Sequence, residues 1–196
     1  LVPASRVRRI GVDRALVGGY GQSNRAMAFA ALDALTRMPG PPTRTAAVIV
    51  LGRTEAGGDG ASGIPYVHRA MQRVIESAGG SEIDLRAAQI SVSASRALVA
   101  TTSSEGRNRG VMVDAIGADA LPLGFRQVIE TFDAAKVVFF LSKKRTRGAA
   151  RSIASLDLDA INVAIASSGK GTPGELVSIY DIYQGTRACS AHLASR

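Results

Sequence analysis

The segment from Ala46 to Leu51 reads Ala-Ala-Val-Ile-Val-Leu, an unbroken apolar run rich in β-branched residues. Such a run is typical of a strand covered on both faces, as inner strands of parallel sheets are. Turn-forming residues bound it, with Pro39-Gly40-Pro41-Pro42 on one side and a glycine-rich loop from Gly52 to Gly63 on the other. We therefore expect residues 46–51 to form a central strand.

Helical patterns lie on both sides of this expected strand. A stretch rich in Ala, Met, Leu and Phe predicts a helix that starts at Ser23 as N-cap, ends near Met38 and is buried on most sides. After the strand, apolar residues recur on one helical stripe, at Val67, Met71, Val74, Ile75 and Ala78. The central strand is thus expected between two helices.

The remainder of the chain continues to alternate between the two patterns. Further strands are expected at residues 6–13, 89–95, 97–101, 111–116, 136–141 and 160–166, and further helices at 121–132, 148–156 and 175–194. Strands separated by helices favour an α/β fold with a mainly parallel sheet. We predict a three-layer sandwich, in a single domain that spans residues 1–196.

Composition excludes several classes of protein. The chain has 196 residues, 46% of them apolar, and a net charge of +8. This apolar content excludes a disordered chain, and no apolar run approaches the ~18 residues of a membrane-spanning helix. The single cysteine, Cys189, excludes an internal disulfide framework and predicts a cytoplasmic location. With His68 and His192 as the two histidines, a Cys/His zinc finger is excluded as well.

The start of the chain also carries information. It begins at Leu1 rather than at methionine, and residues 1–9 are not followed by the apolar region of a signal peptide. We interpret the chain as trimmed or processed, with an upstream segment missing.

Two glycine-rich segments imitate nucleotide-binding motifs. In the loop from Gly52 to Gly63 the spacing departs from Gly-x-Gly-x-x-Gly, and Glu55 and Asp59 would repel a phosphate. In Gly169-Lys170-Gly171-Thr172, a glycine stands where a P-loop has Ser or Thr after its lysine. We expect no cofactor at either segment.

Two further patterns could serve catalysis or binding, or could have no specific function. Ser167-Ser168-Gly169-Lys170 fits a Ser-x-x-Lys pair, in which a desolvated lysine activates a serine, but the pattern is short and common. Residues 143–147, Lys-Lys-Arg-Thr-Arg, form a basic cluster that could meet a nucleic-acid backbone. No aromatic residue is interleaved there for base stacking, so a solvated loop or an oligomer contact is favoured over nucleic acid.

Several segments together resemble one known family. Gly19-Tyr20-Gly21-Gln22-Ser23-Asn24-Arg25, residues 48–58 (VIVLGRTEAGG), residues 90–102 (ISVSASRALVATT) and residues 163–175 (VAIASSGKGTPGE) occur in the order of its motifs. The chain resembles aspartyl aminopeptidase and vacuolar aminopeptidase I-like dinuclear zinc exopeptidases, from residue 17 to the end. The resemblance implies their α/β fold. Residues 102–116 leave little room for the family's inserted oligomerisation domain, which we expect to be largely missing.

The same resemblance indicates which residues of this chain stand at the family's zinc-binding and catalytic positions. It places the family's metal and catalytic positions at Ser23, Thr54, Glu55, Ser95 (or Thr101 in a shifted register) and Gly171, with Lys170 beside the last. Thr54 stands at the catalytic glutamate and Ser23 at the bridging aspartate, so Glu55 is the one carboxylate kept. Two zinc ions need about three ligands each. The resemblance therefore implies a site without metal, and loss of the peptidase activity.

Two functions follow as expectations. The first is a metal-free, aminopeptidase-like protein that serves as a binding or assembly subunit, as a homo-oligomer or with a second protein chain. The alternative is an enzyme with metal-independent hydrolase or transferase chemistry on a small molecule in the same cleft, using Ser23, Thr54, Glu55, Ser95 and Lys170. Glu55 would act as general acid or base and Lys170 as its electrostatic partner. Ligands of open α/β sheets bind beyond the strand ends, so we expect these residues to converge there.

Overall fold

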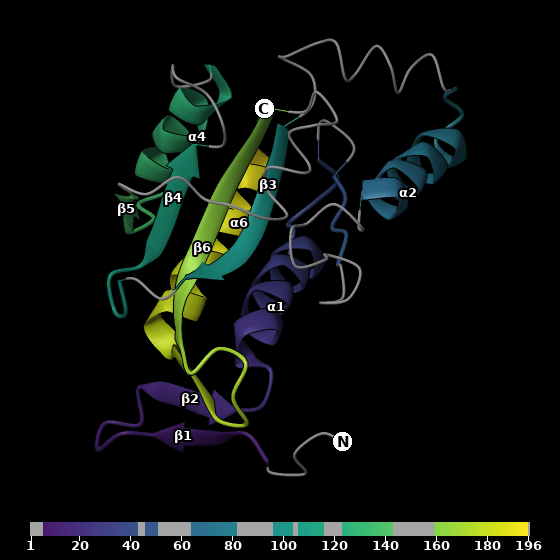
Figure 1. Cartoon of the computed structure of the whole chain (residues 1–196). Helices are drawn as coiled ribbons and strands as arrows, with labels where there is room; N and C mark the ends of the chain where they lie inside the picture. The colour runs from purple at the N-terminus through teal and green to yellow at the C-terminus, as the bar shows by residue number, and fades with distance from the viewer. Residues whose placement is uncertain are drawn as a thin grey trace.

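The computed structural model of the chain describes residues 6–42, 46–50, 64–81, 96–103, 106–115, 123–142 and 159–195 (Figure 1). The strands are β1 (Arg8–Ile10), β2 (Leu16–Gly19), β3 (Arg96–Ser103), β4 (Val111–Ala115), β5 (Phe139–Leu141), β6 (Asp159–Ser168) and β7 (Glu175–Ser178). The helices are α1 (Gln22–Thr36), α2 (Ile64–Ser77), α4 (Leu123–Ala134) and α6 (Ile179–Ala194). Together they form a mixed α/β fold.

The sheet is mostly antiparallel, so the expected mainly parallel sheet is wrong. Its order is β1-β2-β7-β6-β4-β5, with β3 paired to β6. The pairs β3–β6 and β4–β5 are parallel, and the remaining pairs are antiparallel. Short connections explain two of the antiparallel pairs, β1–β2 and β6–β7, because parallel neighbours need a dozen or more linking residues. The turns at 11–15 and 169–174 each join antiparallel strands.

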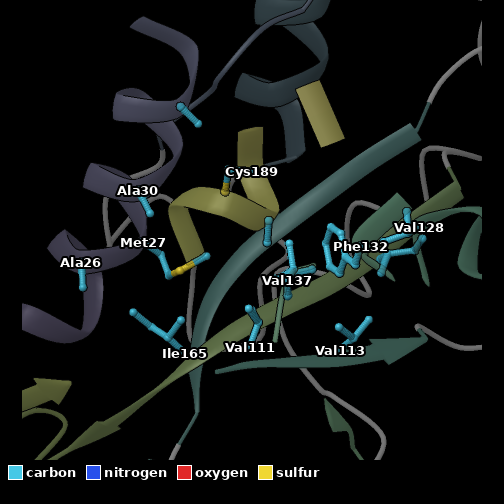
Figure 2. Packing of buried hydrophobic residues seen from close by; sticks show 14 of the residues in the cluster. Ala26, Met27, Ala30, Val111, Val113, Val128, Phe132, Val137, Ile165 and Cys189 are labelled. Carbon is cyan, nitrogen blue, oxygen red and sulfur yellow. The ribbon is translucent and has the colours of Figure 1, made fainter. Parts of the chain in front are cut away.

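One face of the sheet carries the core, shown in Figure 2. Successive side chains of a strand alternate between faces, so the buried odd-numbered residues of β4 and β6 point to the same side. On that side they meet buried residues of α1, α4 and α6, among them Met27, Phe132 and Cys189. These three helices therefore form one layer. The second helical layer of the expected three-layer sandwich is not placed by the described residues.

The approach of α6 to the core is close because of a glycine. A Cβ atom on Gly185 would lie 3.1 Å from the sulfur of Met27 and 3.3 Å from Cγ2 of Ile165. Both distances are tighter than ordinary van der Waals contact. Gly185 thus lets α6 pack directly against α1 and β6.

Residues 46–50, the described part of the expected central strand, form no strand. Ile49 and Val50 are exposed, with 54% of Val50 accessible to solvent. The prediction of a central strand is therefore wrong for these residues, and Leu51 lies outside the described ones. Strand propensity measures how well side chains fit a paired, covered sheet surface, and in the described structure these residues have no strand partner.

The predicted extent of α1 is confirmed, whereas its predicted burial and its predicted N-cap are wrong. Ala26, Met27, Ala30 and Ala34 are buried, whereas Phe29 is 56% exposed and Leu32 is also exposed. The helix is therefore buried on one side rather than on most sides. Its N-cap is Gly21, in the left-handed conformation, and Ser23 is the second helical residue.

The C-terminal helix begins later than expected. Residues 175–178 form β7, and α6 starts at Ile179 with Ser178 as its N-cap, whose side chain accepts the N–H of Asp181. The spacing Ser178-x-x-Asp181 resembles a helix-start signal and could have located this end. Strand β2 was not expected either, because Gly18 and Gly19 suggest a turn.

The other described elements match expectation within a few residues. The expected strands at 6–13, 97–101, 111–116, 136–141 and 160–166 overlap β1, β3, β4, β5 and β6 in turn, and two of the expected helices overlap α2 and α4. The expected strand at 89–95 and the expected helix at 148–156 lie outside the described residues.

Burial makes Cys189 chemically inert, which gives a first prediction. The thiol is 3% exposed in the core, and this desolvation raises its pKa from 9.0 to about 12. We expect a disulfide reagent at pH 8 to label the folded chain far more slowly than the chain in denaturant. Because the pKa is raised by folding, the contribution of the thiol to stability is present below pH 9 and is lost as pH rises toward 12. Equal labelling rates in both states would contradict this result.

Candidate functional site

A buried carboxylate joins two segments that are far apart in the sequence. Glu175, the first residue of β7, accepts the backbone N–H of Ser23 at 2.6 Å through Oε2. Through Oε1 it accepts the N–H of Gly171 at 2.8 Å. Glu175 and Ser23 are both buried. The start of α1 and the turn between β6 and β7 are thereby held together, as Figure 1 shows at the lower end of α1.

The position of Glu175 suits its charge. Ser23 is the second residue of α1, where backbone N–H groups have no partner within the helix. The N-terminus of a helix carries a partial positive charge that favours a carboxylate. Glu175 therefore serves this helix end in place of a side-chain cap, which Gly21 cannot provide.

The turn at 169–174 presents its lysine to solvent. Gly169 and Gly171 have positive φ angles of 71° and 82°, and Thr172 closes the turn by donating to the carbonyl of Gly169. Lys170 is exposed. An exposed ammonium is not desolvated, so the Ser-x-x-Lys chemistry considered for Ser167 lacks its activated lysine.

Three of the expected site residues, Thr54, Glu55 and Ser95, lie outside the described residues. The expected Glu55–Lys170 ion pair therefore stays a prediction. Of the remaining positions, Ser23 and Gly171 meet on the carboxylate of Glu175, through backbone atoms. The sequence interpretation did not single out Glu175.

The comparisons with known proteins point in one direction. The chain is 35% identical over 85 residues to "Probable M18 family aminopeptidase 1" of Thermotoga neapolitana. The chain is related to the M18 family aminopeptidases. This confirms the family resemblance. The matched segment is 42% of this chain and 18% of that relative, and no family model matches the chain.

Solved M18 structures share the fold of this M18-related chain. The M18 family aminopeptidase of Thermotoga maritima superposes with a TM-score of 0.81 at 22% identity, over 98% of this chain and 49% of that one. The S. cerevisiae mApe1 dodecamer superposes with a TM-score of 0.68 at 14% identity, over 97% of this chain and 48% of that one. The chain thus spans about half the length of these solved relatives.

Ser23 and Gly171, which the resemblance places at metal-ligand positions, do not fit zinc. Ser23 offers a hydroxyl, Gly171 offers no side chain, and Lys170 is a cation. Zinc is bound in proteins by thiolate, imidazole and carboxylate groups. The nearby carboxylate of Glu175 already accepts two backbone N–H groups. Within the described part of the chain, no group of three or more His, Cys, Asp or Glu side chains could hold a metal ion.

A second buried carboxylate, Asp181, lies in the first turn of α6. Its Oδ1 accepts the N–H of Gly110 and its Oδ2 the N–H of Asn108, each at 2.9 Å. Desolvation raises the pKa of Asp181, and these two hydrogen bonds act against that rise. Asp181 anchors the turn that leads into β4 and contacts none of the expected site residues among those described.

A shallow hollow lies elsewhere on this M18-related chain, between α4 and α6. Glu130, Thr131, Ala191 and Ser195 are among the residues that line it. None of the expected site residues belongs to it. Among the described helices, none is both long and apolar enough to cross a membrane.

The role of Glu175 can be tested by Glu175→Gln. The amide keeps one acceptor oxygen and turns an N–H donor toward the other backbone N–H, so one buried hydrogen bond is lost. We expect a loss of about 1–3 kcal/mol in the free energy of unfolding. Urea denaturation followed by circular dichroism measures it. The matched control is Glu130→Gln on the exposed face of α4, which should change stability by less than about 0.5 kcal/mol; equal effects would contradict the role of Glu175.

Proposed function

We propose that this chain is a metal-free, aminopeptidase-like protein, and that it serves as a binding or assembly subunit rather than as a zinc peptidase. The observation that carries the proposal is the chemistry of two described positions where the resemblance expects zinc ligands. Ser23 offers a hydroxyl and Gly171 has no side chain, whereas zinc is bound by thiolate, imidazole and carboxylate groups. Both residues donate their backbone N–H groups to the buried carboxylate of Glu175.

The proposed assembly role has two supports. A structural relative, S. cerevisiae mApe1, is a dodecamer. In this chain, α1 exposes Phe29 and Leu32, which are three residues apart and therefore lie on the same helix face. Large apolar side chains gathered on one face favour a contact with another chain. We propose a homo-oligomer, or a pair with a second protein chain.

The remaining features of the proposal concern the chain as a whole. We propose that residues 1–196 form a single domain in a reducing, cytoplasmic location, for which the one buried thiol of Cys189 is suited. The repurposed enzyme stays the alternative. It depends on Glu55, which lies outside the described residues, and on Lys170, whose exposure makes it a weaker electrostatic partner.

Metal content and mass in solution test the proposal together. We expect substoichiometric zinc by elemental analysis after exposure of the purified protein to zinc and dialysis. We expect a mass above that of one chain by light scattering, and a lower mass for Phe29→Asp than for the control Arg73→Asp on α2. Stoichiometric zinc, removed by a chelator with loss of aminoacyl p-nitroanilide hydrolysis, would overturn the metal-free function. A monodisperse monomer that recovers no partner would overturn the assembly role.

A further inference from the structure

Strand β1 forms one edge of the sheet. Among the described strands it pairs with β2 alone, and Figure 1 shows it as the outermost strand at the lower end of the molecule. All three of its residues are exposed. The backbone N–H and C=O groups on the outer side of an edge strand form a row that a further strand can pair with. In the described structure, β1 therefore offers a place for one more strand.

This edge is held firmly on β2 by the close fit of two glycines. A Cβ atom on Gly18 would collide with Cδ1 of Ile10, and a Cβ atom on Gly19 would lie 3.0 Å from Cγ2 of Val7. Adjacent residues of a strand face opposite sides of the sheet, so β1 is packed against β2 on both faces. An edge that is already ordered spares a docking strand the entropic cost of ordering it.

The side chains of β1 indicate what a docked strand should carry. Because successive side chains alternate between faces, Arg8 and Ile10 lie on one face and Arg9 lies on the other. Each residue of a strand docked at this edge would have a cross-strand neighbour on its own face. Two adjacent residues of that strand would thus lie opposite the arginines, one on each face. The residues that flank the arginines, Val7 and Ile10, are apolar and exposed.

The charge around this edge favours a partner with carboxylates. Residues 6–20, which include β1 and β2, contain one aspartate and four arginines, namely Arg6, Arg8, Arg9 and Arg14. The aspartate, Asp13, lies in the turn beyond β1, where Oδ1 accepts the N–H of Ala15. Strand β2 has no charged residue. The next strand, β7, contributes Glu175, which is buried and accepts two backbone N–H groups.

Two other occupants fit this edge less well. A symmetric dimer would pair two β1 strands antiparallel, and the register that pairs all three residues sets Arg9 opposite Arg9 of the second copy. Like charges directly opposite each other are destabilising. A nucleic acid has the right charge, but its phosphate backbone has no row of donors and acceptors that matches a strand edge. Lying on one face, it would meet Arg8 or Arg9 but not both.

We propose that the β1 edge, defined as Val7, Arg8, Arg9 and Ile10, binds an extended segment of a partner protein that carries two adjacent carboxylates between apolar residues. The segment adds a strand to the sheet. Backbone hydrogen bonds supply the affinity, and the cross-strand pairs of side chains supply the specificity. The inference rests on the proposed role as a binding subunit and assigns its class of partner.

Fluorescence anisotropy with a labelled peptide that contains Val-Glu-Glu-Val tests the proposal. This pattern reads the same in both directions, so it suits a parallel or an antiparallel strand. We expect saturable binding to the full chain, and none for the same peptide with lysine in place of glutamate. N-methylation of both glutamates keeps the charge but blocks the backbone N–H that faces β1. We expect it to abolish binding, which charge attraction alone does not predict.

Variants of the chain locate the binding to this edge. The double variant Arg8→Gln, Arg9→Gln should weaken binding of the peptide by about tenfold, because two cross-strand charge pairs are lost. The matched control is Arg69→Gln, Arg73→Gln, which removes the same charge from exposed side chains of α2. It should bind the peptide like the parent chain. Circular dichroism checks that both variants are folded.

Several results would overturn the inference. No binding by the parent, equal affinity of both double variants, or unchanged binding of the N-methylated peptide would each exclude strand addition at this edge. Tighter binding of an oligothymidine, lost in Arg8→Gln, Arg9→Gln, would assign the edge to nucleic acid. A lower mass of that variant in solution, without peptide binding by the parent, would assign it to a second copy. Zinc content and parent mass are read separately, so failure of the proposed function is distinguishable from failure of this edge.

Discussion

Replacement of Gly110 by alanine is expected to cost about 2–5 kcal/mol of stability, the largest effect we predict for a single methyl group. Gly110 has a φ of +82°, and a Cβ atom there would collide with the backbone carbonyl of Val138. A left-handed conformation costs an L-residue about 1–2 kcal/mol, and overpacking adds about 1–3 kcal/mol. Backbone atoms cannot rotate away as a flexible side chain can. Urea denaturation of Gly110→Ala measures the loss.

Gly79→Ala is the matched control for this substitution. Gly79 also has a φ of +82°, but no heavy atom lies within 4 Å of a Cβ placed there. We therefore expect Gly79→Ala to lower the free energy of unfolding only by the cost of the left-handed conformation, about 1–2 kcal/mol. The difference between the two variants isolates the collision with Val138. Similar losses in both would show that the close approach of Gly110 to Val138 has no energetic consequence.

Asp181→Ala is expected to destabilise the chain by about 2–4 kcal/mol. The change leaves the N–H groups of Asn108 and Gly110 without the acceptor they now share. Each unpaired buried donor costs about 1–3 kcal/mol, and that of Asn108 lies nearer to solvent. The control Asp133→Ala removes an exposed carboxylate from α4 and should stay within about 0.5 kcal/mol of the parent. Equal unfolding midpoints for both variants would contradict the anchoring role.

The raised pKa of Asp181 gives this prediction a pH dependence. Desolvation raises the pKa above the ordinary value of 3.8, so the folded chain holds the proton more tightly than the unfolded chain does. The resulting contribution to stability is fully present below pH 3.8 and is lost as pH rises through the folded pKa. The amide in Asp181→Asn cannot ionise, so the free energy of unfolding of this variant does not fall in the same way as pH rises. The difference in free energy of unfolding between parent and variant should therefore shrink as pH rises through this window. A difference that is constant with pH would contradict a raised pKa for Asp181.

The candidate site shows how far sequence interpretation reaches. Motif order alone led to the M18 family, and it marked Ser23 and Gly171 as positions where zinc ligands are lacking. It did not find Glu175, because no local pattern shows that a carboxylate will bond an amide 152 residues away. Asp181 could be detected in the sequence as part of a helix-start pattern after Ser178. The hydrogen bonds that its carboxylate accepts from Asn108 and Gly110 could not be detected, because they form between segments that are distant in the chain.

The sequence by itself determined the elements whose signals are local. Helical periodicity located α2 and α4, and compact apolar runs located β4 and β6, because side-chain spacing follows from backbone geometry. Tertiary structure decided the rest. The same kind of apolar run forms buried β6 at 159–168 but an exposed segment at 46–50, because burial depends on which strands pair with it. Strand direction, the start of α6 and the partners of Glu175 were likewise set by contacts between distant segments, which local composition does not record.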